Sequence, residues 1–351
     1  MDSTRNAFTL SPAALDTYDR LRDEAVDAVA NAFHARLGAD AGQLDAVRRQ
    51  ACRTDIAFHL EFLRPILETG LLQAYVDYLK WLSDVFIARN IPCDHIGVVL
   101  NLIGAYFARQ MPDEGRVVAD TLARAFEQSI DLGPERLAPA NRGLSPQTSA
   151  FRDALLRGDR LAAVAIFEAC EQAGRSLVEI YVDLVQASLV DIGWKWQHNE
   201  ISVALEHLAS QTAQSIMADR FSRTALAAPT GRRAILTCVD GNNHDLGLRM
   251  VAHGLEADGW QVLCLGASLP VPSLIGLIRE FQPELVGLSV ALPTHFTPAR
   301  LAIAAMRKAF AEACPRLVVG GGAINRYPQL LEFIGADIHV ADAASLTKID
   351  F

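Results

Sequence analysis

The chain lacks the features that mark several large classes of protein. Its 351 residues include 32 Lys and Arg against 41 Asp and Glu, and no basic run occurs, so we expect no nucleic-acid partner. No apolar run approaches the roughly 20 residues of a membrane span. The first ten residues have neither the basic nor the apolar part of a signal peptide. We therefore expect a cytoplasmic protein without a membrane partner.

Cysteine is scarce and scattered. The six cysteines form no C-x-x-C pair, so neither a disulfide framework nor a zinc site is expected. The chain is 51% hydrophobic and 21% charged, a balance typical of a folded globular protein rather than a disordered one.

Residues 1–132 predict an all-α domain. Ser11-Pro12 is a typical helix start. Segments with apolar residues at helical spacing follow, and they are separated at Gly38, Gly70, Pro92 and Pro112. The expected helices are 12–37, 42–68, 71–90, 93–110 and 114–131. Their number is compatible with a globin-like or phycobiliprotein-like arrangement.

Residues 133–148 predict a linker, because glycine and proline recur there. Residues 149–226 then predict a four-helix bundle with short connections. Gly193 is expected to interrupt the approach to the last helix, and Glu200 to open that helix. The expected helices are 149–157, 159–173, 175–192 and 199–225.

From residue 232 onward the spacing of apolar residues changes. Residues 232–351 predict a doubly wound α/β domain of flavodoxin or Rossmann type. Short apolar runs alternate with helical stretches, which is typical of a parallel sheet. The expected strands are 234–239, 261–265, 285–290, 316–319 and 338–340.

Candidate ligand-binding residues follow three of these strands. The segment Asn242-x-His244-Asp245-x-Gly247 follows the first strand, Ser289 ends the third, and Gly320-Gly321-Gly322 closes the fourth. The carboxyl ends of parallel strands share one sheet edge, where such sheets bind ligands. A lone histidine in such a turn is most often an ordinary turn residue. Glycines at this edge would let the backbone approach a large flat ligand.

Together these residues resemble the cobalamin-binding domain of methionine synthase, the carbon-skeleton mutases and light-sensing cobalamin repressors. That family carries Asp-x-His-x-x-Gly, then Ser-x-Leu, then a glycine pair, and here 41 residues separate Gly247 from Ser289. The resemblance implies that His244 is the lower axial ligand of cobalt. It also implies that Ser289, Ala291 and Gly320–Gly322 line the slot for the displaced nucleotide tail.

The chain departs from that pattern at two positions. Asn242 replaces the usual carboxylate, and an amide makes the imidazole less basic, so we expect a more labile cobalt–histidine bond. Ala291 replaces the leucine of Ser-x-Leu, which would loosen packing.

The bundle carries a second signature, Trp196 followed after nine residues by Glu206-His207. Either part alone is more often bundle core or a solvated edge. Together they resemble the adenosylcobalamin photoreceptors, which implies that the tryptophan covers the adenosyl group, that the Glu-His pair contacts it, and that light breaks the cobalt–carbon bond. The repressors have histidine directly after this tryptophan. Here Gln197 takes that place and the histidine is His198, so we expect no stable bis-histidine state after illumination.

The all-α domain contains a candidate tetrapyrrole site. Asp55 and His59 are four residues apart on one expected helix, and Tyr78 and Trp81 share a face of the next. A subfamily of cobalamin photoreceptors that pairs cobalamin with biliverdin has a similar architecture, which implies biliverdin here. Haem, with His59 or His95 as ligand, is a second option. The alternative is that Asp55 pairs locally and His59 is a satisfied core histidine.

We therefore expect a light-sensing cobalamin protein rather than an enzyme. The alternative is a corrinoid methyl carrier serving a separate methyltransferase. A mutase is not expected, because residues 1–226 offer no strands for a catalytic barrel of about 250 residues. No kinase, cyclase or DNA-binding signature is present, so output would pass through light-dependent homo-oligomerisation or a separate effector.

Overall fold

The computed structural model describes residues 7–37, 46–131 and 143–346. The chain divides into two compact units, residues 1–137 and 138–351, so the bundle and the α/β domain belong to one unit. Among the described helices, none is both long and apolar enough to cross a membrane.

The first unit is helical in its described part, as predicted. Ser11 caps the first helix by accepting from the Ala14 N–H at 3.2 Å, and the buried Tyr18 hydroxyl donates to the Leu60 carbonyl at 2.8 Å. The start of the second expected helix, 42–45, lies outside the described residues, and the globin-like arrangement stays a prediction. The helices are α1 (Pro12–Leu37), α2 (Ala46–Thr69), α3 (Leu72–Ala88), α4 (Asp94–Gln110) and α5 (Gly115–Asp131).

Helices of the second unit pack around an apolar core that includes Phe151, Phe167 and Ile216. Ser145, Asp159, Ser176 and Ser202 cap four of these helices through side-chain oxygens that accept backbone N–H groups. The elements are α6 (Pro146–Leu156), α7 (Arg160–Gln172), α8 (Leu177–Ile180), the π-helical η2 (Tyr181–Gln186), α9 (Ala187–Gln197) and α10 (Val203–Phe221).

Three local expectations for this region were wrong. The last residues assigned to the linker, 146–148, form the first turn of α6, because Ser145 caps it and proline suits a first helical position. Gly193 does not end a helix, since α8, η2 and α9 are continuous to Gln197. Glu200 precedes the last helix, which begins after Ser202, and pairs with Lys195 at 2.8 Å.

The α/β domain contains the predicted five-stranded parallel sheet, in the order β2-β1-β3-β4-β5. Strand order reverses between β1 and β3, so the connections leaving these two neighbours diverge and open a crevice at their carboxyl ends. The strands are β1 (Arg233–Cys238), β2 (Gln261–Cys264), β3 (Leu285–Ser289), β4 (Arg316–Gly320) and β5 (Ile338–Val340).

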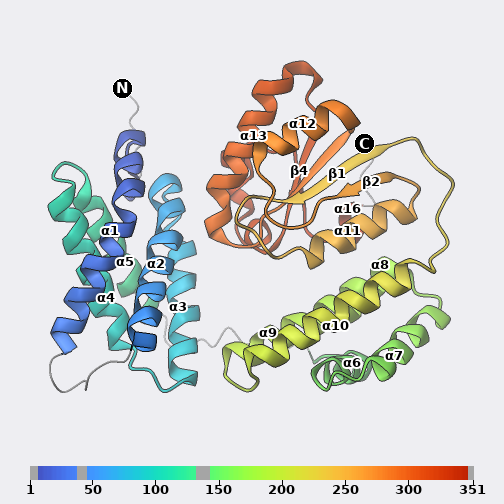
Figure 1. The fold of residues 1–351 in the computed structure, drawn as a ribbon, viewed down its shortest axis with the longest axis horizontal. Coiled ribbons are helices and arrows are strands. Elements are labelled where there is room, and N and C mark those ends of the chain that lie inside the picture. Colours follow the sequence, from blue (N-terminus) through green and yellow to red (C-terminus); the bar gives the residue numbers. More distant parts are fainter. Residues whose placement is uncertain (1–6, 38–45, 132–142, 347–351) are drawn as a thin grey trace. The chain divides into compact units, whose positions relative to one another are not determined.

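Helices cover both faces of this sheet (Figure 1). One face carries α11 and α16, which contact each other, and the other carries α12 and α13. These helices are α11 (Leu246–Ala257), α12 (Val271–Phe281), α13 (Phe296–Phe310) and α16 (Ala343–Leu346), with the shorter α14 (Gly322–Arg326) and α15 (Leu331–Ile334) between β4 and β5.

A polar contact joins the bundle to α11. The hydroxyl of Tyr181, the first residue of η2, lies 2.8 Å from Nδ1 of His253 and 3.2 Å from the Met217 carbonyl. The His253 ring stacks on Phe221 with centroids 4.0 Å apart. Burial lowers the pKa of His253 to about 4, so its ring is neutral at pH 7. The bundle is therefore attached to the helix that begins two residues after His244.

Candidate functional site

His244 lies in the loop between β1 and α11 with its side chain exposed. The Asn242 side-chain oxygen lies 2.9 Å from the His244 backbone nitrogen and 3.2 Å from its Nδ1. Because this oxygen can only accept, the contact favours the tautomer that carries its proton on Nδ1. Nε2 then keeps a free lone pair, the state in which imidazole binds a metal.

Asn242 itself is fully buried and fixed from its other side. Its Nδ2 donates to the Ser289 carbonyl at 2.9 Å and approaches the Ser289 hydroxyl at 3.3 Å. A carboxylate at this position could not donate to that carbonyl. The amide therefore joins the β1 loop to the end of β3, which a carboxylate would do less well.

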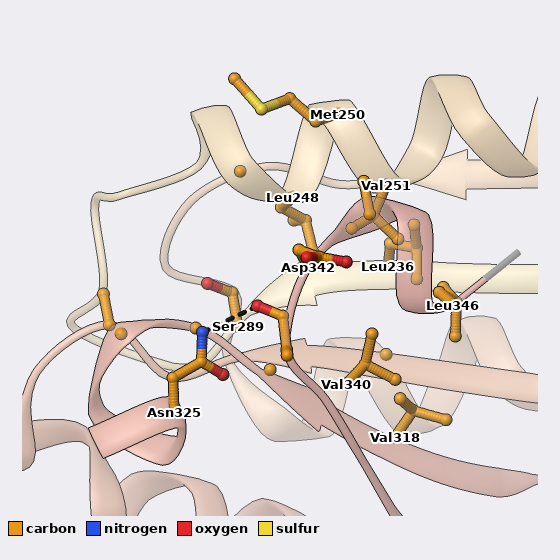
Figure 2. A pocket seen from close by; sticks show the side chains of 18 of the residues that line it. Leu236, Leu248, Met250, Val251, Ser289, Val318, Asn325, Val340, Asp342 and Leu346 are labelled. Carbon is orange, nitrogen blue, oxygen red and sulfur yellow. Dashed lines mark hydrogen bonds between the residues drawn. The ribbon is translucent and has the colours of Figure 1, made fainter. Parts of the chain in front are cut away.

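A cavity of about 290 Å³ opens at the carboxyl ends of β1, β3 and β4 and is lined by His244. Figure 2 shows its polar side near Ser289 and Asn325, whose Nδ2 donates to the Ala341 carbonyl at 2.7 Å. Apolar side chains line the rest: Leu236, Leu248, Val251, Val318, Val340 and Leu346. Ala291 and Gly320–Gly322 also line this cavity. It is a mainly apolar slot with hydrogen-bonding groups on one side.

A second cavity, of about 530 Å³, lies between the bundle and the His244 loop. Glu206 and His207, near the start of α10, line it together with His244, Asp245 and Gly247. Nδ1 of His207 is 2.9 Å from a Glu206 carboxylate oxygen, and Ser210 donates to the other oxygen at 2.8 Å. The Glu206-His207 part of the helical signature and the loop histidine thus border one space.

The glycines at this edge have different roles. A Cβ on Gly247 would meet nothing within 4 Å, so this position opens onto the cavities. Gly321 has φ 112°, and its Cβ would lie 2.7 Å from the Val290 carbonyl oxygen, while a Cβ on Gly320 would lie 2.8 Å from the Val340 oxygen. Positions 320 and 321 therefore need glycine because a side chain there would collide with neighbouring backbone, whereas Gly247 leaves room for a ligand.

Trp196 is not brought to either of these two cavities. It lies half-buried in the last turn of α9, while Glu206 lies in the first turn of α10. His198, at the end of α9, has Nδ1 2.8 Å from the Trp194 carbonyl oxygen, and its ring stacks on Trp194 at 4.0 Å.

The four residues predicted for a tetrapyrrole lie on α2 and α3. His59 is buried, which lowers its pKa to about 4, and its Nδ1 lies 3.3 Å from the Tyr78 hydroxyl. The Tyr78 ring is 6.3 Å from that of Trp81. Asp55 is exposed at the surface, although burial of its carboxyl raises its pKa. His59 and Tyr78 thus form a neutral buried pair next to Trp81.

Several residues at the site were missed by sequence reasoning. Gln186, Gln211 and Gln214 line the second cavity, and Asn325 and Asp342 line the first. The i, i+3 spacing of Gln211 and Gln214 on an expected helix was a usable signal. For Gln186 there was none, because its position depends on the π-helical segment.

Another missed residue is His295, which is buried close to His244, with ring centroids 6.5 Å apart. Its Nδ1 accepts from the Leu292 N–H at 3.1 Å. Burial, with a smaller contribution from His244, lowers its pKa to about 4. No sequence pattern distinguished it from an ordinary helix-start residue.

Two segments of the chain match models of known protein families. Residues 232–347 match the model described as B12 binding domain, and residues 148–219 match a second model of the same description. The C-terminal domain is a B12 binding domain. The matched segments carry both the His244 loop and the helices that face it, which supports a cobalamin cofactor.

Similar proteins fall into two groups. The HTH-type transcriptional repressor CarH of Myxococcus xanthus is 27% identical over 239 residues, 66% of this chain and 77% of the relative. CarA of the same organism, also an HTH-type transcriptional repressor, is 36% identical over 25% of this chain and 31% of its own length. Trimethylamine corrinoid protein 1 of Methanosarcina acetivorans is 20% identical over 56% of this chain and 92% of its own. The chain thus spans less than a third of CarA.

Among solved structures, the monomethylamine corrinoid protein of Methanosarcina barkeri is 20% identical, with a TM-score of 0.48, over 56% of this chain and 93% of that one.

The residues present fit a cobalamin. His244 offers an exposed, oriented imidazole, Gly247 leaves open space beside it, and the slot beyond Ser289 is apolar enough for an aromatic base. Asn242 lies behind this imidazole, within 3.2 Å of its Nδ1.

Proposed function

We propose that this protein is a light sensor that binds adenosylcobalamin between the bundle and the B12 binding domain, and that it is not an enzyme. The observation that carries the proposal is that His244 borders both the apolar slot and the cavity lined by Glu206 and His207. A cobalt ligand at this point has one side toward the sheet and the other toward the bundle.

On the sheet side, His244 would bind cobalt through Nε2, oriented by Asn242. Asp245 is held by Arg249 at 2.8 Å and would keep the start of α11 in place. Ser289, Ala291 and Gly320–Gly322 would border the nucleotide tail.

On the bundle side, Glu206 and His207 would contact the adenosyl group. Trp196 lines neither cavity, so its role in covering that group stays a prediction from the sequence. Bound adenosylcobalamin would supply a cobalt–carbon bond that light can break. Because His253 and Tyr181 connect α11 to η2, a change at the His244 loop would reach the bundle helices. Output would then follow as altered self-association or binding of an effector, without direct nucleic-acid binding.

Green light provides the test. Protein loaded with adenosylcobalamin in the dark should lose its adenosylcobalamin spectrum on illumination and release a low-molecular-weight adenosyl product, and its oligomeric state should change in size-exclusion chromatography. A spectrum that changes no faster than that of free adenosylcobalamin, with no change of assembly, would contradict the proposal.

The alternative function is a corrinoid methyl carrier. It is supported by the relatives named as trimethylamine and dimethylamine corrinoid proteins. A carrier would accept a methyl group from a partner methyltransferase in repeated turnover and would not need the Glu206–His207 pair. Substituting both residues separates the two functions. A sensor should then lose its light response, whereas a carrier should keep its methyl transfer.

For the first unit we propose biliverdin as a second chromophore, next to His59, Tyr78 and Trp81. The support is the buried His59–Tyr78 pair beside an indole. Protein purified with biliverdin should show a far-red absorption band that His59→Leu removes. A haem spectrum with a Soret band would instead support haem.

A further inference from the structure

Three glutamines line the cavity between the bundle and the His244 loop. Gln186 ends the π-helical segment and borders both cavities, while Gln211 and Gln214 are three residues apart on α10. Within the described part of the chain, none of the three side-chain amides makes a hydrogen bond, whereas the neighbouring Ser210 bonds to Glu206. The cavity thus presents three amides with unused donors and acceptors.

The charged groups of the same cavity are acidic and already paired. Glu206 is held by His207 and Ser210, and Asp245 by Arg249. An anionic group entering this space would face both carboxylates, while a neutral polar group would not. The lining therefore favours a ligand rim that is polar and uncharged.

We propose that Gln186, Gln211 and Gln214 recognise the primary amides on the rim of a corrin ring and select fully amidated corrinoids over those with a free carboxylate. This rests on the proposed cobalamin site, because His244 borders the same cavity and a corrin bound to it must fill that space. Glutamine and a primary amide pair reciprocally, each donating an N–H to the carbonyl oxygen of the other.

Replacing one ligand amide by a carboxylate removes the donor that the glutamine carbonyl needs. An unsatisfied group costs about 1–3 kcal/mol, so each lost pair should weaken binding by about 5–150-fold. Repulsion from Glu206 and Asp245 acts in the same direction.

The test is a double-mutant cycle between protein and ligand. Hydroxocobalamin and its b-, d- and e-monocarboxylic acids are titrated into the full-length protein and into Gln186→Leu, Gln211→Leu and Gln214→Leu. Gln172→Leu is the matched control, because Gln172 is exposed on α7 away from the cavity. Thermal unfolding of each variant confirms that the fold is kept.

We expect hydroxocobalamin to bind at least about 10-fold more tightly than one of the acids, and this preference to shrink in at least one cavity variant but not in Gln172→Leu. Equal affinity for hydroxocobalamin and all three acids, or preferences unchanged in every glutamine variant, overturns the inference while leaving the cobalamin site intact. Failure of hydroxocobalamin to bind overturns the inference, and failure of adenosylcobalamin to bind in the dark as well overturns the proposed function too.

Discussion

The side-chain oxygen of Asn242 lies 3.2 Å from Nδ1 of His244. An amide is therefore sufficient to orient the histidine, and its nitrogen makes a second bond, to the Ser289 carbonyl, that a carboxylate could not make. The asparagine at this position therefore has a structural reason. Asn242 links the His244 loop to β3, the strand whose end lines the slot.

Asn242→Asp should destabilise the protein without cofactor by about 1–3 kcal/mol at pH 7, because the Ser289 carbonyl loses its donor and faces a carboxylate. Urea denaturation measures this. Asn243→Asp, at the exposed neighbouring position, adds the same charge and should cost far less. Equal losses in the two variants would mean that charge alone, and not the bond to Ser289, matters.

Gly247 and Gly321 should respond oppositely to added side chains. Gly247→Val should leave the melting temperature unchanged within a few degrees but weaken cobalamin binding about 10-fold or more, since its Cβ enters open space. Gly321→Ala should lower stability by about 1–3 kcal/mol, because of its positive φ and the contact with the Val290 oxygen.

Gly276→Val is the control for the glycine pair, since Gly276 is also open but lies on α12 away from both cavities. If Gly247→Val binds hydroxocobalamin as tightly as this control, the open space beside His244 is not where the cofactor lies.

The sequence predicted the strands and the His244 loop because both depend on local signals. Each strand is a short apolar run, and a turn at Gly241 lies three residues after the end of β1. The continuous helix through Gly193 was missed because a glycine ends a helix only where the backbone turns, and here the i→i+4 pattern carries on. The bond from Asn242 to Ser289 joins residues 47 positions apart and needs the assembled sheet.

His59 should make the first unit acid-sensitive. Its pKa is about 4 in the fold against an ordinary 6.5, so its contribution to stability is complete above pH 6.5 and is lost as the pH falls toward 4. At pH 5 the loss should be of the order of 1–2 kcal/mol. Urea denaturation at pH 7 and pH 5 measures it, followed by fluorescence in a background where Trp194, Trp196 and Trp260 are replaced by Phe, so that Trp81 alone reports. His59→Gln should reduce the difference in the free energy of unfolding between the two pH values. An equally large difference in that variant would mean that another group causes the pH dependence.

After illumination, the cobalt should carry no nitrogen from residue 197 or residue 198. Gln197 offers none, and His198 is engaged by the Trp194 carbonyl and stacked on the Trp194 ring. His198→Ala should therefore leave the spectrum of the illuminated protein unchanged. A bis-histidine spectrum in the wild type that disappears in His198→Ala would show that α9 rearranges to release this side chain.

The most direct test of the account is the electron paramagnetic resonance spectrum of the protein loaded with cob(II)alamin after labelling its histidines with ¹⁵N. Coordination by His244 predicts doublet nitrogen splitting in the labelled protein, triplet splitting in the unlabelled protein, and no doublet in labelled His244→Ala. Triplet splitting in the labelled protein would mean that the nucleotide base of the cofactor binds cobalt, and would contradict the assignment of His244.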